Sequence, residues 1–193
     1  MRIDLKFNTR IVQNTNQGHY AIYIFNNILE DDYLKELLDK TLELTEKDSM
    51  NRKTNVQANM TTYHKMLEEP IYIKFQSIVL SHLHTCICLR NYHVTVPSYD
   101  FEEFWGMQFK KGEKTVPHTH LGSNANQWSG VFCIDSDDKA GQIAFPDMDF
   151  SDIMQPNSLY MFPSMMPHYT LPYQSDKPRV ALSFNLIANT PKK

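Results

Sequence analysis

The sequence predicts one domain, residues 1–193, of mainly β structure in the α+β class, with two helices followed by an antiparallel sandwich or jelly roll. Two observations support this prediction. Apolar residues recur at helical spacing in two stretches before residue 92, whereas beyond it short apolar or alternating runs are interrupted by Gly, Pro, Asn and Asp. A length of 193 residues also suits one domain with a single core.

The composition is that of a soluble globular protein, with 41% hydrophobic and 21% charged residues. A formal net charge of -3 argues against a nucleic-acid partner, which would require a basic face. The N-terminus lacks the apolar run of a signal peptide, and no apolar stretch is long enough to span a membrane. We therefore expect a cytoplasmic protein without a membrane partner. Cys86, Cys88 and Cys133 lack CxxC spacing, which indicates free thiols.

The first elements expected are two short strands and a helix. Residues 1–7 alternate between apolar and polar, and residues 20–25 are rich in β-branched and aromatic side chains, so each range predicts a strand. A polar turn is expected between them at 14–19. Acidic residues at 30–32 favour a helix N-terminus, and apolar residues at helical spacing over 34–42 predict that an amphipathic helix follows.

A long loop and a second helix are expected next. Residues 47–65 are polar and without a clear period, which predicts the loop. After Pro70, an apolar stripe predicts the helix, which contains His82 and His84. Residues two apart on a helix project about 200° from each other. These two histidines are therefore not expected to bind one metal ion together.

The rest of the chain predicts seven short strands. They are expected at 101–111, 114–121, 128–135, 141–145, 158–162, 166–171 and 178–188. Because no helical period intervenes, the strands are expected to pair antiparallel in a sandwich or jelly roll.

Three histidines within this β region are candidate metal ligands. His118 and His120 are two apart in a segment predicted to be extended, so their side chains share a face and can reach one ion. His168 follows the predicted strand at 158–162 and a Phe-Pro-Ser segment, and it opens the next predicted strand. A sandwich can place that segment beside His118 and His120, so His168 is the expected third ligand.

Arg179 is a candidate anion-binding residue. In the predicted strand at 178–188, Arg179 and Ser183 share a polar-leaning face with Ala181 and Asn185, opposite an apolar face. A guanidinium directed into a β core is costly to desolvate without an anion, and its planar fork suits a carboxylate. An internal salt bridge is the structural alternative.

Together these residues resemble the Fe(II)/2-oxoglutarate-dependent dioxygenases, in particular the small, often phage-encoded members of the prolyl-hydroxylase-like branch. The resemblance covers about residues 100–188. The matching positions are Trp105, Gly112, His118-Thr119-His120, Ser129-Gly130-Val131, Phe145-Pro146-Asp147, Phe162-Pro163-Ser164, His168 and Arg179.

The resemblance implies a double-stranded β-helix (jelly-roll) core at 100–188. Residues 1–99, which the resemblance does not cover, are expected to add the N-terminal strands and helices. It implies Fe(II) as metal, 2-oxoglutarate as co-substrate, O2 as oxidant and ascorbate as a supporting reductant. The distal carboxylate of 2-oxoglutarate would pair with Arg179, assisted by Ser183. The substrate would be a protein side chain, of the prolyl type, or a small molecule. The implied catalytic and metal-binding residues are His118, His120 and His168.

Two departures from the family pattern stand in the sequence. Ala181 replaces the serine of the usual Arg-x-Ser, and His120 stands where most of the superfamily has a carboxylate. Three arrangements of the metal remain open: three histidines; two histidines and water, with His120 hydrogen-bonded to substrate; or a carboxylate recruited from elsewhere, such as Glu113 or Asp135.

Two other functions remain as alternatives. The spacing from Gly112 to His120 also fits the opening of the cupin metal-binding motif, but Asn124 stands where that motif requires Glu, and no glycine precedes His168 at the required position. The second alternative is a jelly-roll module without catalysis, with a binding or structural role. The sequence contains no pattern that predicts an oligomeric state.

Overall fold

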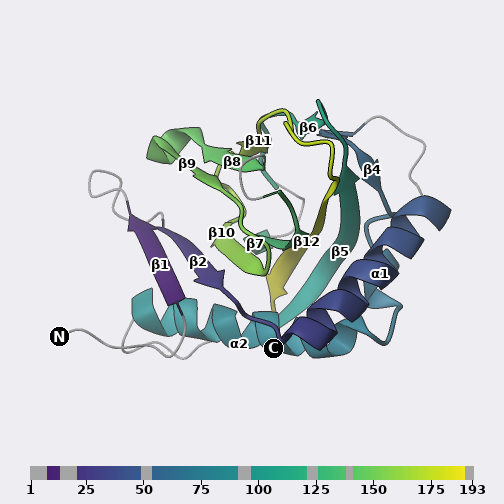
Figure 1. Ribbon diagram of the computed structural model, residues 1–193. Helices are drawn as coiled ribbons and strands as arrows, with labels where there is room; N and C mark the ends of the chain where they lie inside the picture. Colours follow the sequence, from purple (N-terminus) through teal and green to yellow (C-terminus); the bar gives the residue numbers. More distant parts are fainter. Residues whose placement is uncertain are drawn as a thin grey trace.

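The computed structural model describes residues 8–13, 21–48, 54–90, 97–120, 126–137 and 141–189. This part of the chain is mainly β, with two α-helices and antiparallel sheets, as the sequence predicts (Figure 1). The strand predicted at 1–7 and the turn predicted at 14–19 lie outside the described residues. The strand predicted at 20–25 is confirmed as β2 (Ala21–Asn26).

The largest sheet has seven strands, and its neighbours pair antiparallel. Three of its strands are ten residues or longer and overlap runs predicted as strands after residue 92: β5 (Tyr99–Phe109), β7 (Asn126–Asp135) and β12 (Arg179–Ala188). In spatial order the strands are β1 (Asn8–Gln13), β2, β10 (Ser158–Pro163), β7 (Asn126–Asp135), β12 (Arg179–Ala188), β5 (Tyr99–Phe109) and β4 (Asn59–Met60).

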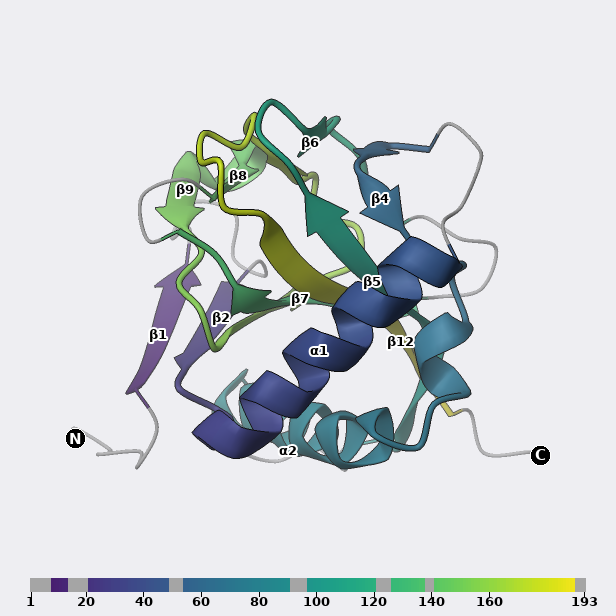
Figure 2. The same ribbon diagram turned by 45° about the vertical axis from the view of Figure 1, so that its right-hand side comes forward.

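Two smaller sheets lie on one side of the large sheet, opposite the helices (Figures 1 and 2). Aromatic and aliphatic side chains from Trp105, Phe109 and Val131 of the large sheet pack with Ile143 and Phe145 of the three-stranded sheet. The strands of the smaller sheets are β11 (Tyr169–Thr170), β8 (Gln142–Phe145) and β9 (Phe150–Ile153) in one, and β3 (Val56–Gln57) and β6 (Lys114–Thr115) in the other.

The two predicted helices are confirmed as α1 (Asp31–Lys47) and α2 (Tyr72–Arg90), and they cover the other face of the large sheet (Figure 2). Acidic residues stand in the first turn of α1 and Lys47 in its last turn, which complements the helix dipole. Leu37 and Phe75 pack with Leu182 and Phe184 of β12 in the core between the layers. The apolar face predicted for residues 178–188 therefore faces the helices and leaves the polar-leaning face to the other side.

The loop predicted at 47–65 is wrong in part. Residues 49–53 lie outside the described residues, but β3, β4 and the start of a short 3-10 helix (Lys65–Leu67) follow. Each strand is only two residues long, and its partner is distant in sequence: β3 pairs with β6 and β4 with β5. Because tertiary pairing creates these strands, their local sequence carries no period to reveal them.

The predicted strands at 114–121 and 166–171 are shorter than expected, and β9 was not predicted. Within those two ranges, regular strand pairing is limited to β6 and β11. Outside these two strands, an isolated antiparallel bridge joins His118 to His168. The turn signals at Pro117 and Pro167 explain the shortening, since proline cannot donate to a strand ladder.

Gly130 of the Ser-Gly-Val motif has a packing role. It lies in β7 opposite Phe184 of β12. A Cβ built at Gly130 would lie 2.3 Å from Cζ of the Phe184 ring, closer than any real contact. A glycine at this position therefore lets the aromatic ring cross the strand and fill the core beneath the helices.

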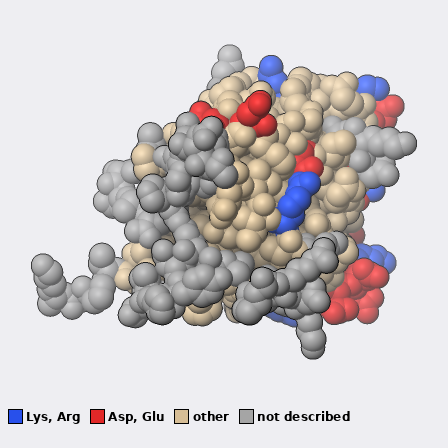
Figure 3. Space-filling view, turned by 90° about the vertical axis from the view of Figure 1, so that its left-hand side faces the viewer, with Lys and Arg blue, Asp and Glu red and all other residues tan. Residues whose placement is uncertain are grey.

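The surface on the β1 side carries few basic side chains in the part of it that the structure describes, and they are interspersed with acidic ones (Figure 3). That face therefore offers no described basic patch for a phosphate backbone. Among the described helices, none has both the length and the apolar character needed to cross a membrane.

His82 and His84 diverge on α2, as predicted. His82 is 6% exposed and its ring centroid lies 4.3 Å from that of Phe25. His84 is exposed, and its Nε2 lies 3.4 Å from Sγ of Cys88. Burial lowers the pKa of His82 to about 4, so the folded protein holds this ring neutral.

We expect His82 to make the fold sensitive to acid. Because its pKa is lower in the folded than in the unfolded chain, its contribution to stability is present above pH 6.5 and is lost as the pH falls toward 4. The loss should be about 2–3 kcal/mol over that range. Urea unfolding at pH 7 and pH 4 measures it. His82→Phe, which still packs on Phe25, should reduce the pH dependence, whereas the exposed His84→Phe should not. Equal pH dependence in wild type and His82→Phe would contradict this account.

Candidate metal centre

Backbone pairing brings the three candidate histidines together. The His118 N–H donates to the His168 carbonyl at 3.1 Å, and the His168 N–H donates to the His118 carbonyl at 3.0 Å. The His120 N–H donates to the Ser164 carbonyl at 2.9 Å. One potential ligand atom from each of the three side chains lies within 4.8 Å of the others. The structure thus places all three imidazoles in one cluster, although β6 ends before His118.

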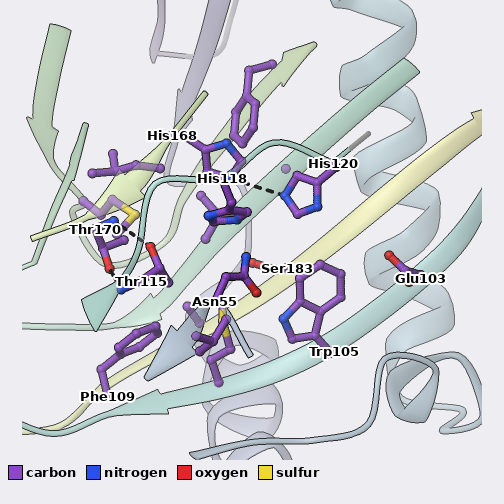
Figure 4. Close-up of a pocket in the computed structure, with 18 of the residues that line it drawn as sticks. Asn55, Glu103, Trp105, Phe109, Thr115, His118, His120, His168, Thr170 and Ser183 are labelled. Carbon is purple, nitrogen blue, oxygen red and sulfur yellow. Dashed lines mark hydrogen bonds between the residues drawn. The ribbon is translucent and has the colours of Figure 1, made fainter. Parts of the chain in front are cut away.

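Paired threonines fix the two segments just before and after the histidines. The Thr115 N–H donates to Oγ1 of Thr170 at 2.9 Å, and the Thr170 N–H donates to Oγ1 of Thr115 at 2.7 Å (Figure 4). Both threonines are buried. These reciprocal bonds join β6 to β11 and hold the two histidine-bearing segments in register.

The ring orientations of His118 and His168 suit metal binding. Nδ1 of His118 lies 2.7 Å from the Val116 carbonyl, and Nδ1 of His168 lies 2.9 Å from the Met166 carbonyl. Because a carbonyl only accepts, Nδ1 carries the proton in both rings and Nε2 keeps its lone pair. Backbone carbonyls orient metal-binding histidines in this way in many proteins.

The spacing of the ring nitrogens also fits a shared ion. Nε2 of His120 lies 3.3 Å from Nε2 of His168 (Figure 4). Two nitrogens that each lie about 2.1 Å from one ion, at about 90–110°, are about 3.0–3.4 Å apart. Burial lowers the pKa of His118, lowers that of His120 to about 3, and lowers that of His168 well below its ordinary value. The three imidazoles are therefore neutral, which is the ligand form.

The two carboxylates considered as alternative ligands are engaged elsewhere. Oε2 of Glu113 accepts the Lys110 N–H at 2.6 Å. Oδ1 of Asp135 accepts from Nζ of Lys177 at 2.6 Å. Within the described residues, the metal-ligand group contains three histidines and no carboxylate. The structure therefore gives no support to a ligand role for either acid.

The histidine cluster lines a cavity of about 390 Å³, within the range of small-molecule sites (Figure 4). Its wall comes from the face of the large sheet that looks away from the helices, and from the smaller sheets opposite. Apolar lining residues include Met107, Phe109, Val131, Ile143 and Phe162. The cavity is thus a largely apolar chamber with polar groups at a few positions.

Arg179 is the deepest charged residue of the cavity. It is 1% exposed, and its Nε and Nη1 have no hydrogen-bond partner among the described residues. Its guanidinium carbon lies 4.1 Å from the centroid of Phe109. Burial lowers the pKa of Arg179 to about 10, so the group still carries its charge at neutral pH. The alternative of an internal salt bridge finds no partner in the described chain, and a buried cation without an anion implies an anionic ligand.

Gly141 packs closely against the Arg179 side chain. A Cβ built at Gly141 would lie 3.1 Å from Cδ and 3.3 Å from Nη1 of Arg179.

Ser183 lines the same cavity on β12. It stands four residues from Arg179, about 13 Å away at strand spacing, so the two side chains contact different parts of the cavity.

The structure adds cavity residues to which the sequence gave no role. Trp105 was part of the family pattern, but its function was not predicted. Its buried Nε1 has no hydrogen-bond partner among the described residues, and its ring is held edge-on by Tyr63, with centroids 5.2 Å apart. Glu103 precedes it on the same face of β5. The alternation of residues 101–111 was the signal available, since every second residue from Glu103 to Phe109 lines the cavity.

Comparison with known proteins was made at the level of sequence and of structure. No family model and no curated protein sequence matches the chain. Solved structures do match. A viral collagen prolyl hydroxylase from Paramecium Bursaria Chlorella virus-1, in complex with 2-oxoglutarate, has a TM-score of 0.66 and 15% identity, over 91% of this chain and 100% of that one.

Two further structures extend the comparison. A prolyl hydroxylase from Trichoplax adhaerens, in complex with a peptide fragment of the hypoxia inducible factor oxygen degradation domain, has a TM-score of 0.61 and 14% identity, over 86% of this chain and 83% of that one. HygX from Streptomyces hygroscopicus, with nickel, 2-oxoglutarate and hygromycin B bound, has a TM-score of 0.63 and 8% identity, over 87% of this chain and 83% of that one. The chain thus shares the fold of these three proteins, two of which are prolyl hydroxylases, as the resemblance in its sequence predicted.

Proposed function

We propose that this protein is an iron- and 2-oxoglutarate-dependent oxygenase that hydroxylates a protein side chain or a small molecule. One observation carries the proposal: the cavity lined by three neutral imidazoles is also lined by Arg179, a buried cation with two nitrogens that have no partner in the described part of the chain. A cation site and an anion site in one cavity suit a ligand that chelates a metal at one end and carries a carboxylate at the other.

The histidines would hold the metal. His118 and His168 would bind Fe(II) through Nε2, since their Nδ1 protons are engaged by backbone carbonyls, and His120 lies beside them as a third candidate ligand. Fe(II) held there would supply, with 2-oxoglutarate and O2, the oxidation of a C–H bond. The apolar walls of the cavity exclude water from the reacting groups, and the reciprocal bonds between Thr115 and Thr170 keep the ligand-bearing segments from separating.

Arg179 would bind the distal carboxylate of 2-oxoglutarate. Its planar fork offers two parallel donors to the two carboxylate oxygens, and the stacking on Phe109 fixes its plane. Ser183, further along β12, would contact the co-substrate nearer the histidines. These contacts would orient the co-substrate before the prime substrate enters.

We further propose that residues 100–188 form a double-stranded β-helix, or jelly roll, and that residues 1–193 make up one domain. The large sheet and the smaller sheets that face each other across the cavity support the first proposal. The core in which α1 and α2 pack against β7 and β12 supports the second, because within the described residues the two helices share their core with the sheet.

The substrate would insert a single side chain or small group into the cavity. A cavity of about 390 Å³ is at the small end of ligand sites, and the co-substrate would occupy part of it. A prolyl side chain of a peptide is the first substrate to test, because two prolyl hydroxylases share the fold; HygX, whose structure holds hygromycin B, makes a small molecule the second.

The direct test is release of succinate when the purified protein is supplied with Fe(II), 2-oxoglutarate, O2 and ascorbate. We expect slow release without prime substrate, and measurable binding of both Fe(II) and 2-oxoglutarate by calorimetry. Binding of metal without 2-oxoglutarate would point to a cupin-type metal-dependent enzyme. Binding of neither would leave a jelly-roll module without catalysis, and the oxygenase proposal would be wrong.

A further inference from the structure

His120 is held differently from the other two histidines. Nδ1 of His118 and of His168 each faces a backbone carbonyl, whereas Nδ1 of His120 lies 3.3 Å from Nδ2 of Asn185. An amide NH2 group only donates, so in this contact Nδ1 of His120 is the acceptor. The carbonyl neighbours of His118 and His168 place the ring proton on Nδ1, whereas Asn185 leaves Nδ1 of His120 without one.

The orientation of the Asn185 amide is set by its other partners. Nδ2 lies 2.5 Å from Oε2 of Glu103, and a carboxylate only accepts. Oδ1 lies 2.7 Å from the Ser129 hydroxyl, which donates to it. Asn185 pairs with Glu103 on one neighbouring strand and with Ser129 on the other, so three adjacent strands place the three side chains in a row. The NH2 group is therefore directed to the side that Glu103 and His120 share.

This orientation determines the tautomer of His120. Since Nδ1 accepts from Asn185, the neutral ring carries its proton on Nε2, which lies 3.3 Å from Nε2 of His168. A protonated Nε2 has no lone pair for a metal ion. For Nε2 of His120 to bind metal, the proton must move to Nδ1 and Asn185 must present its oxygen instead, which would direct that oxygen at the Glu103 carboxylate as well.

We propose that Glu103, acting through Asn185, restrains His120 from joining the metal centre. Glu103 is then a positioning residue that determines whether two or three histidines bind the ion. The inference rests on the proposed function, because it concerns the same centre.

The test is Glu103→Gln, measured by calorimetric titration of the metal-free protein with Co(II). Glutamine can donate to the turned oxygen of Asn185, so the restraint is lost, and we expect Co(II) to bind about tenfold tighter or more. An effect of charge alone has the opposite sign, because removal of a carboxylate near the cavity weakens the binding of a cation. X-ray absorption at the cobalt edge should count two imidazole ligands in the wild type and three in the variant.

Matched variants make the result specific. Glu102→Gln changes the adjacent residue of β5, which does not line the cavity, and should leave Co(II) affinity unchanged. His120→Ala should abolish the gain when combined with Glu103→Gln. Asn185→Ala removes the donor to His120 and should tighten binding in the same direction, so the inference can be tested even where one variant does not fold.

The outcomes separate this inference from the proposed function. If the wild-type protein binds no metal, the oxygenase proposal itself fails. If the wild-type protein binds Co(II) but Glu103→Gln and Asn185→Ala bind it equally or more weakly, the centre stands and the restraint on His120 is refuted. Three imidazole ligands already present in the wild type would refute it as well.

Discussion

Replacing Arg179 by methionine is expected to lower the affinity for 2-oxoglutarate by at least about a hundredfold, which corresponds to the loss of two charge-assisted hydrogen bonds. The same change should make the ligand-free protein more stable by about 1–2 kcal/mol. The buried guanidinium has two nitrogens without described partners, and the relief of that cost exceeds the loss of its stacking on Phe109. Calorimetric binding and urea unfolding without ligand measure the two effects.

Opposite signs for binding and stability distinguish an anion site from a structural arginine. Lys177→Met is the matched control, since Lys177 is an exposed neighbour that pairs with Asp135 and should change neither quantity appreciably. If Arg179→Met left the 2-oxoglutarate affinity intact, the assignment of the co-substrate would be wrong. If it strongly destabilised the free protein, Arg179 would have a structural partner instead.

His118→Gln and His168→Gln are each expected to weaken binding of Fe(II) or Co(II) by more than about a hundredfold. Loss of a ligand should cost more than loss of a group that only orients one, and the latter typically costs about 10–100-fold. Glutamine roughly preserves side-chain size, which limits the cavity left in the buried position of His168. Metal titration under anaerobic conditions, with succinate release as a second readout, measures the effect.

The third histidine provides an internal comparison. His120→Gln should cost less metal affinity than either of the other two changes, because the contact with Asn185 already disfavours its Nε2 as a ligand. His84→Gln, on the exposed side of α2, is the control and should have no effect. Unchanged metal affinity in both His118→Gln and His168→Gln would contradict the metal centre.

Local signals in the sequence predicted the elements whose cause is local. Helical spacing of apolar residues predicted α1 and α2, and alternation predicted the long strands β5, β7 and β12. The two-residue strands β3 and β4 were missed, because their partners come from distant parts of the chain. A strand created only by tertiary pairing leaves no period in its own residues.

The candidate site, like the fold, could be predicted from the sequence only in part. The sequence by itself determined which residue types are available, and the alternation along the final strand was enough to select Arg179 and Ser183 as members of one face. Only the tertiary structure decided that Arg179 is buried without a salt-bridge partner among the described residues, and that His168 pairs with His118 across an antiparallel bridge. The tautomer of His120 was also decided there, because it depends on the register of three neighbouring strands that brings Asn185, Glu103 and Ser129 into contact. Spacing along one strand determines which side chains lie on the same face of the sheet. The register between neighbouring strands determines which of those side chains form hydrogen bonds with one another.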